Sequence, residues 1–173
     1  MRFSTSWQYS ILKDKPVKET HLDRSCYCLW DLQSTDRFPA LQEMLALVTQ
    51  LGEHSRELLL RALETRELAG ATVVAPGVSM PHCRSILVDD FVIVVGRSGK
   101  GVGWPDEPVK LVILFISPVK PSGPQEHMDL IKHLAGRLGE NGPEKLFAAA
   151  GAGQLAQLLG FQLAEGGADA SGS

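Results

Sequence analysis

The sequence predicts an α/β fold in which a mixed sheet of about five strands is flanked by helices. Apolar residues at helical spacing follow position 36, short β-branched segments occupy residues 72–116, and a Leu-rich helical pattern follows residue 124. Because helices precede and follow the strands, and no internal repeat is present, the helices should cover a central sheet. A length of 173 residues is ordinary for one domain.

The first half of the chain predicts one short strand and two helices. Residues 28–32 suit the strand, and residues 34–36 offer capping side chains for a helix that closes at Gly52. The apolar positions of this helix are Phe38, Leu41, Leu45, Val48 and Leu51. A second helix over residues 55–68 shares one face among Leu59, Ala62, Leu63 and Arg66.

The middle of the chain predicts the sheet. Residues 72–74, 78–80, 86–88 and 91–95 are β-branched segments separated by Gly, Pro and Asp turns, and residues 99–104 predict a loop or a short edge strand. Residues 109–116 are the most apolar run, interrupted only by Lys110 near its start. Such a run is typical of an interior strand buried on both faces.

The last third predicts a breaker-rich loop and then helices. The loop covers residues 118–124, a helix over 125–138 ends at Gly139, and a helical pair follows at 143–149 and 153–159. The patterns divide the chain into an N-terminal extension of unknown role (1–27), a folded domain (28–163) and a small, polar tail expected to be disordered (164–173).

Composition and charge limit the classes of function. Hydrophobic residues make up 44% and charged residues 21% of the chain, as in soluble globular proteins. A net charge of -3 leaves no basic surplus for phosphates, so we expect no nucleic-acid partner. No stretch approaches the roughly 20 apolar residues of a membrane helix, and the start does not resemble a signal peptide. We expect a cytoplasmic protein without membrane insertion.

The three cysteines predict neither a disulfide framework nor a metal site. Cys26, Cys28 and Cys83 are an odd number without an export signal, so reduced thiols are expected. His21 with Cys26 and Cys28 could begin a zinc site, but no second ligand pair follows. A nucleophilic dyad of Cys83 with His82 is disfavoured because adjacent residues leaving a strand point in opposite directions. We therefore expect no metal and no cofactor.

The most unusual local sequence is GVSMPHCRS at residues 77–85, in which a strand stops at Pro81 and delivers His82. Proline ends ladder pairing and fixes φ, so the histidine is displayed from a rigid scaffold. A neutral imidazole is nucleophilic, and a hydrogen bond to one nitrogen can orient the ring. This pattern alone is equally compatible with a structural histidine near a turn.

A second histidine favours the functional interpretation. His127 stands in the first turn of the helix after residue 124. It begins the core-facing stripe that continues through Ile131, Leu134 and Leu138. There apolar packing gives way to a pocket, beside free backbone N–H groups that favour anions. His133 lies off this stripe, and we expect it to be solvated.

Two arginines are candidates for binding an anion. Arg66 continues the stripe of Leu59 and Leu63, and an inward-pointing guanidinium needs an anionic partner. That partner is either a permanent carboxylate or a transient phosphate, and the sequence leaves both open. Arg84, two residues past His82, is the second candidate, with a surface-loop position as the alternative.

The order of these motifs resembles the type-2 enzyme IIA domains of the bacterial phosphotransferase system, the fructose, mannitol and nitrogen-regulatory class. The matching elements, spread over about residues 28–159, are Arg66-Glu67, Gly70-Ala71-Thr72, the 77–82 string, Gly96-Arg97-Ser98, Gly101-Val102, Pro108-Val109, Ser117-Pro118 and Glu126-His127. The chain departs from the family at 71–73, where Ser-Thr-Gly is common, and at Cys83, where Gly or Ala is usual.

The resemblance implies a mixed five-stranded sheet and a role for each matching residue. His82 would accept the phosphoryl group, His127 would line the site and assist, and Arg66 would be the site arginine. Thr72 matches a threonine near the same loop, and with Arg84 would support the phosphate site. The implied donor is the histidine-containing phosphocarrier protein, and the implied acceptor is a IIB domain. No nucleotide or metal is required.

Two other functions remain open at this stage. The same fold could be a regulator in which phosphorylation switches a protein contact by adding charge. Alternatively, His82 is vestigial and the domain is only an interaction module. The sequence contains no IIB or IIC segment, which favours a stand-alone carrier or regulator, with possible contact to a membrane transporter.

Overall fold

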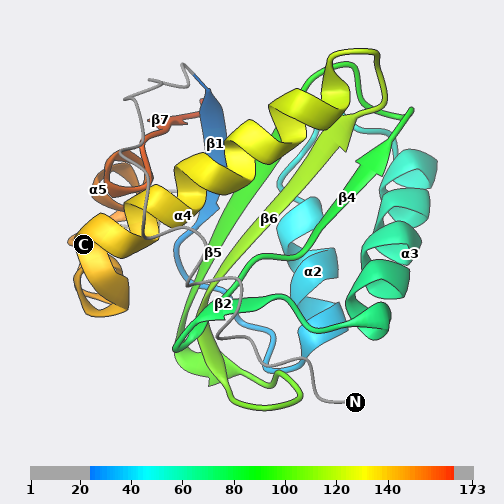
Figure 1. Cartoon of the computed structure of the whole chain (residues 1–173). Coiled ribbons are helices and arrows are strands. Elements are labelled where there is room, and N and C mark those ends of the chain that lie inside the picture. The colour runs from blue at the N-terminus through cyan, green and yellow to red at the C-terminus, as the bar shows by residue number, and fades with distance from the viewer. Residues whose placement is uncertain (1–23, 166–173) are drawn as a thin grey trace.

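The computed structural model describes residues 24–165 as a mixed sheet between two helical layers (Figure 1). Its elements are β1 (Ser25–Leu29), α2 (Arg37–Leu45), α3 (Glu53–Ala69), β2 (Val73–Ala75), β3 (Val78–Ser79), β4 (His82–Ser85), β5 (Val92–Val102), β6 (Val109–Pro118), α4 (Gly123–Phe147), α5 (Ala152–Leu158) and β7 (Gln162–Leu163). The strand order is β2-β3-β6-β5-β1-β7, and β4 also pairs with β6. The predicted fold class is confirmed.

The sheet has seven strands rather than about five. The strand expected at 86–88 is wrong: Leu87 N–H donates to Ser85 Oγ in a turn, and the strand precedes it as β4. Strand β7 was not predicted, because two residues carry no readable period. Strand β5 extends through most of the loop expected at 99–104, with a register irregularity before Val102.

Strand β6 is the central strand that its apolar sequence predicted. It pairs in parallel with β3 and β4 on one side and antiparallel with β5 on the other. Only Lys110 is exposed among its residues, and successive side chains enter two different cores. Leu111, Ile113 and Phe115 face one core, while Val112, Leu114 and Ile116 face the other. The prediction of burial on both faces is confirmed.

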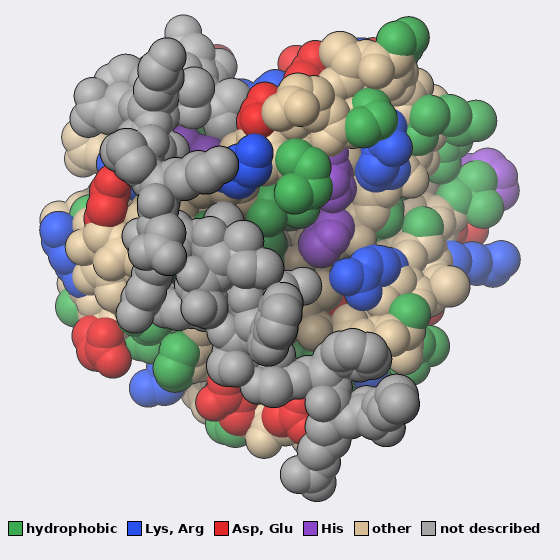
Figure 2. Space-filling model, viewed as in Figure 1, with side chains coloured by type: hydrophobic (Ala, Val, Ile, Leu, Met, Phe, Trp, Pro, Cys, Tyr) green, Lys and Arg blue, Asp and Glu red, His purple; other side chains and the backbone are tan. Residues whose placement is uncertain are grey.

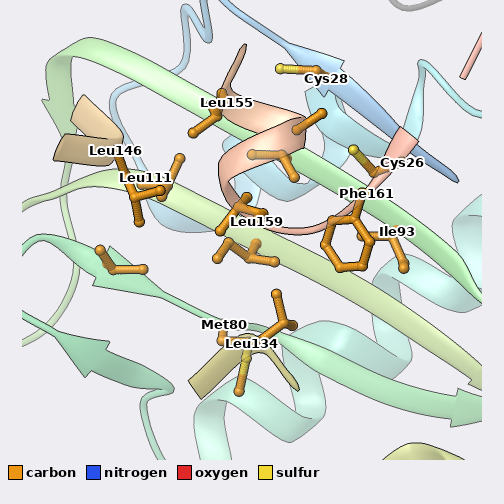
Figure 3. Packing of buried hydrophobic residues seen from close by; sticks show 14 of the residues in the cluster. Cys26, Cys28, Met80, Ile93, Leu111, Leu134, Leu146, Leu155, Leu159 and Phe161 are labelled. Atoms are coloured by element: carbon orange, nitrogen blue, oxygen red, sulfur yellow. The ribbon is translucent and has the colours of Figure 1, made fainter. Parts of the chain in front are cut away.

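Helices α4 and α5 cover one face of the sheet, and α2 and α3 cover the other. On the first face, Cys26 and Cys28 of β1 point toward Leu155, Leu159 and Phe161 (Figure 3). Strand β1 therefore starts three residues before the expected segment. Cys26 and Cys28 are buried, and neither they nor Cys83 form a disulfide within the described residues.

Two helix ends differ from the sequence pattern. Helix α2 ends at Leu45, and residues 46–51 form turns, although their apolar spacing predicted helix up to Gly52. Helix α4 does not stop at Gly139 but continues to Phe147 across a kink at Gly142, where φ is 73°. Pro143 follows the kink, so the two helical segments expected there are joined. Within the described residues, no helix is long and apolar enough to cross a membrane.

Candidate functional site

His82 is the first residue of β4, which follows β3 after an interruption of two residues, Met80 and Pro81. Ser79 of β3 pairs with Val112, and His82 of β4 pairs with Phe115, so β3 and β4 follow the same register along β6. Between them Pro81 has no N–H, and its carbonyl accepts from Phe115 N at 3.1 Å. The strand therefore continues past the proline, and His82 is held by a ladder rather than by a loop.

Two contacts fix the His82 ring. It stacks on Phe115 with centroids 5.0 Å apart and planes 6° apart. Its Nδ1 lies 2.8 Å from the carbonyl oxygen of Met80. A carbonyl can only accept, so Nδ1 carries the hydrogen, and the lone pair of the neutral ring is on Nε2. The nucleophilic nitrogen is thereby selected by the backbone.

His127 approaches His82 from the first turns of α4. The two ring centroids are 5.4 Å apart with planes tilted by 56°. The Nδ1 atom of His127 lies 2.5 Å from Oγ of Ser117, which is fully buried near the end of β6. The expected convergence of His82 and His127 is thus present. Ser117 was not predicted as a site residue, although a lone hydroxyl closing the most apolar strand was a readable signal.

Both imidazoles are held neutral near pH 7. Burial lowers the pKa of His82, and the Arg66 charge adds to this, whereas the Met80 carbonyl and the Glu67 carboxylate oppose it. Burial also lowers the pKa of His127 to about 4, assisted by the charges of His82 and Arg84. Two neutral imidazoles side by side supply one nucleophile and one hydrogen-bonding neighbour at physiological pH.

Arg84 lies beside the start of α4. A Cβ built on Gly123 would be 2.8 Å from Nη2 of Arg84 and 2.8 Å from the Pro118 carbonyl oxygen. Only glycine therefore allows this approach of the guanidinium to the helix N-terminus. The side chain of Arg84 is exposed, and its charge lowers the pKa of His127. Arg84 is therefore both a surface residue and a neighbour of the site, so the two alternatives predicted for it are compatible.

Arg66 does not point inward, and this expectation was wrong. The buried face of α3 continues from Leu59 and Leu63 to Glu67, while Arg66 is exposed and donates to the Gly70 carbonyl at 3.2 Å. The helical phase places position 67, rather than 66, four residues after Leu63. No carboxylate within the described range lies at ion-pair distance from Arg66. Its charge nevertheless reaches His82.

Thr72 is buried and its hydroxyl donates to Oε2 of Glu67 at 2.7 Å. Its backbone carbonyl accepts from Met80 N at 2.8 Å. The hydroxyl is therefore engaged within the protein, and Thr72 contacts the site through the backbone that positions His82. Glu67, the acceptor, was quoted in the sequence motif but was not predicted to take part.

His133 is buried, which contradicts the expectation of a solvated side chain. It is 6% exposed, and its Nε2 lies 2.9 Å from the Leu159 carbonyl oxygen. The turn after α5 and Phe161 cover this side of α4, a long-range contact that helical spacing cannot reveal. It does not join the site of His82.

One face of the molecule shows the site at the surface (Figure 2). Histidine side chains lie together there, with Lys or Arg side chains on either side and apolar side chains next to them. The segments that carry the site also expose apolar side chains: Ile86, Leu87, Val119 and Met128. His82 and His127 are themselves partly exposed. Over the part of the chain that is described, no three His, Cys, Asp or Glu side chains are grouped as metal ligands; His21 lies outside it.

Comparison with known proteins identifies the family of the chain. Residues 21–160 match the family model described as phosphoenolpyruvate-dependent sugar phosphotransferase system, EIIA 2. A curated relative, the PTS system 2-O-alpha-mannosyl-D-glycerate-specific EIIABC component of Escherichia coli (strain K12), is 28% identical over 127 residues. These cover 70% of this chain, which spans only 19% of that relative.

Solved structures share the fold. The nitrogen regulatory protein IIA-Ntr from Neisseria meningitidis has a TM-score of 0.68 and 24% identity over 77% of this chain and 92% of its own. The enzyme IIA-mannitol complex with phosphorylated enzyme IIB-mannitol from Escherichia coli gives a TM-score of 0.61 and 19% identity over 77% and 93%.

The mixed sheet and its helical layers are those of an enzyme IIA domain of type 2. The chain belongs to the EIIA 2 family of the phosphoenolpyruvate-dependent sugar phosphotransferase system, whose members are phosphotransfer components.

Proposed function

We propose that this protein is a phosphohistidine carrier in which His82 accepts a phosphoryl group on Nε2. The observation that carries the proposal is the hydrogen bond from Nδ1 to the Met80 carbonyl, which leaves Nε2 as the free nucleophile beside His127. The donor is a histidine-containing phosphocarrier protein. The group then passes to a IIB domain or remains as a regulatory signal, and the reaction takes place in the cytoplasm.

The transfer needs no cofactor. The Nε2 lone pair of His82 forms the new P–N bond while the bond to the carrier's imidazole breaks, and the electron pair returns to that imidazole. The hydrogen on Nδ1 stays in place, and the Met80 carbonyl stabilises the positive charge that develops on the ring. Catalysis of this kind consists mainly of positioning and electrostatic stabilisation.

The neighbours of His82 can stabilise the transferred group. The hydroxyl of Ser117 can donate to Nδ1 of His127. The neutral imidazole of His127 then carries its hydrogen on Nε2 and can donate it to a phosphoryl oxygen. The guanidinium of Arg66 is exposed on the His82 side, and that of Arg84 lies at the N-terminus of α4. Two cations and a helix N-terminus suit an anionic group of high charge.

The partners are proposed from surface chemistry and from relatives. The exposed side chains of Ile86, Leu87, Val119 and Met128 offer apolar area around the acceptor, as a docking protein requires. The enzyme IIA-mannitol structure was solved with phosphorylated enzyme IIB-mannitol, which supports a IIB domain as one partner. The mannosylglycerate relative combines A, B and C components, so contact with a membrane transporter is part of the proposal.

The test is phosphorylation by a phosphorylated carrier protein. Wild-type protein should take up one phosphoryl group, and His82→Ala should take up none, as measured by intact-protein mass spectrometry at alkaline pH. His54→Ala is the matched control, because His54 is an exposed histidine near the start of α3. Absence of uptake by the wild type would contradict the carrier function and favour a module that only binds partners.

A further inference from the structure

Glu67 is a buried carboxylate beside the site whose role the proposed function does not include. It is 1% exposed and accepts three hydrogen bonds from neutral donors. These come from Thr72 N at 3.0 Å, Thr72 Oγ1 at 2.7 Å and Trp104 Nε1 at 2.7 Å. No lysine or arginine of the described segment lies at ion-pair distance from it. A buried carboxylate without a cation is costly, so such a group calls for a specific account.

The three donors place Glu67 at the root of the loop that carries His82. Thr72 is bound to Glu67 through its N–H and its hydroxyl, and its carbonyl accepts from Met80 N at 2.8 Å. Met80 in turn accepts from Nδ1 of His82 at 2.8 Å. Hydrogen bonds thus connect Glu67 to Thr72, Thr72 to Met80 and Met80 to His82. Displacement of Thr72 would therefore move the carbonyl that selects the His82 tautomer.

Trp104 attaches the same carboxylate to the opposite part of the fold. Its ring is buried in the core formed with α2 and α3, and it follows β5 in the chain. Glu67 thus joins the end of α3, the β2 loop and the segment after β5 at one point. A single side chain that ties three segments together restricts the movement of each.

Adjacent residues at the end of α3 present opposite charges on opposite sides. Arg66 is exposed, whereas Glu67 points into the protein. Arg66 lowers the pKa of His82 and Glu67 raises it. The last turn of α3 therefore carries an exposed cation and a buried anion that shift the pKa of His82 in opposite directions.

We propose that Glu67 is a positioning residue that fixes the Nδ1–H tautomer and orientation of His82 through Thr72 and Met80. This inference rests on the proposed function for its consequence, since the tautomer decides which nitrogen can accept a phosphoryl group. The Arg66-Glu67 pair then has two tasks. Arg66 faces the transferred group, and Glu67 holds the acceptor.

The first experiment measures the His82 ring nitrogens directly, without any phosphoryl donor. Long-range ¹H–¹⁵N spectra of the full chain should show the Nδ1–H tautomer in the wild type. Glu67→Leu should give a mixture of tautomers. Glu67→Gln keeps the shape but removes the charge, so the pKa of His82 should fall, whereas Arg66→Ala should raise it. Glu43→Gln is the matched control, because Glu43 also accepts from two backbone N–H groups and a hydroxyl, but at Gln33 and Ser34.

The second experiment measures the rate of phosphoryl uptake from the phosphorylated carrier protein. Glu67→Leu should be about tenfold slower and Thr72→Val about threefold slower, because misplacement of a reacting group reduces the rate without removing it. Thr72→Ser keeps the hydroxyl and should restore the wild-type rate. Glu43→Gln should match the wild type.

The outcomes separate this inference from the proposed function. If the wild type takes up no phosphoryl group but the tautomer still depends on Glu67, the carrier function fails and the positioning role stands. If Glu67→Leu and Thr72→Val keep the wild-type tautomer and uptake rate, the positioning role is overturned. Should Glu67→Leu not fold by circular dichroism, Glu67→Gln and the Thr72→Val and Thr72→Ser pair decide the question.

Discussion

Helix α4 carries two histidines, His127 and His133, whose surroundings differ in more than burial. His127, near the start, meets a serine hydroxyl, a second imidazole and partly open surface. The Nε2 atom of His133, further along the helix, lies 2.9 Å from the Leu159 carbonyl oxygen, and the ring centroids of His133 and Phe161 are 5.5 Å apart. The first environment leaves a nitrogen free for chemistry, and the second secures the chain after α5.

A glycine lies close to each of the two regions, and the two glycines have different effects. Gly160 has φ of 80°, and a Cβ placed on it would lie 2.6 Å from Nε2 of His133. The backbone at Gly160 thus packs directly against the imidazole. At the His127 end, Gly123 makes room for the guanidinium of Arg84. Gly160 thus packs against the imidazole of His133, whereas Gly123 allows the guanidinium of Arg84 to approach the N-terminus of α4.

The largest expected effect separates the two histidines kinetically. His127→Ala should slow phosphoryl uptake by about tenfold to a hundredfold, because a hydrogen-bonding neighbour of the transferred group is lost. Its free energy of unfolding should change by only about 1 kcal/mol, since the side chain is half-buried. Single-turnover uptake and urea unfolding would measure both. An unchanged rate would remove His127 from the site.

His133→Leu should show the reverse pattern. The buried Leu159 carbonyl loses its partner, so the free energy of unfolding should fall by about 1–3 kcal/mol. Uptake per folded molecule should equal that of the wild type. A strong loss of uptake in a folded protein would mean that His133 influences the site of His82 and His127, contrary to this comparison.

The two histidines also show what the sequence could predict. Local signals were sufficient for the fold class and for β6, because strand composition and helical phase act over a few residues. The meeting of His82 with His127 was implied by the resemblance to the enzyme IIA family. Arg66 was misplaced since one residue of helical phase separates an exposed side chain from a buried one. His133 was misjudged because α5 and its following turn reach it from 26 residues away along the chain.

Hydrogen bonds were the part that sequence patterns could not supply. Nothing local pairs Glu67 with Trp104, which lies 37 residues further on, or Ser117 with a particular nitrogen of His127. The interruption at Pro81 was predicted, yet the continuation of the strand as β4 depends on register with β6. Such details follow from tertiary pairing, and they decide the chemistry of the site.

Gly160→Ala should lower the free energy of unfolding by about 1–2 kcal/mol, because alanine is strained at positive φ and its Cβ would collide with the imidazole of His133. Thermal unfolding measures the cost. In a His133→Ala background the contact with the imidazole is absent, whereas the strain at φ and the 2.9 Å approach to Nε of Arg137 remain, so the cost should be smaller. Equal costs in both backgrounds would show that the imidazole does not contact this position.

A further effect concerns the dependence of stability on pH. The pKa of His127 falls from 6.5 to about 4 in the folded protein, so the unfolded chain binds a proton that the native state refuses. This contribution to stability is complete above about pH 6.5 and is lost as pH falls toward 4. His127→Gln should lose less stability over that interval in urea titrations. Parallel pH profiles of the two proteins would contradict the neutral, partly buried imidazole.

The most direct test of the central claim identifies the phosphorylated atom. After phosphorylation of ¹⁵N-histidine protein by the carrier, ³¹P–¹⁵N coupling should appear at Nε2 of His82 alone, with Nδ1 still carrying hydrogen toward Met80. Coupling to Nδ1 of His82, or to His127, would contradict the selection of the acceptor nitrogen by the Met80 carbonyl.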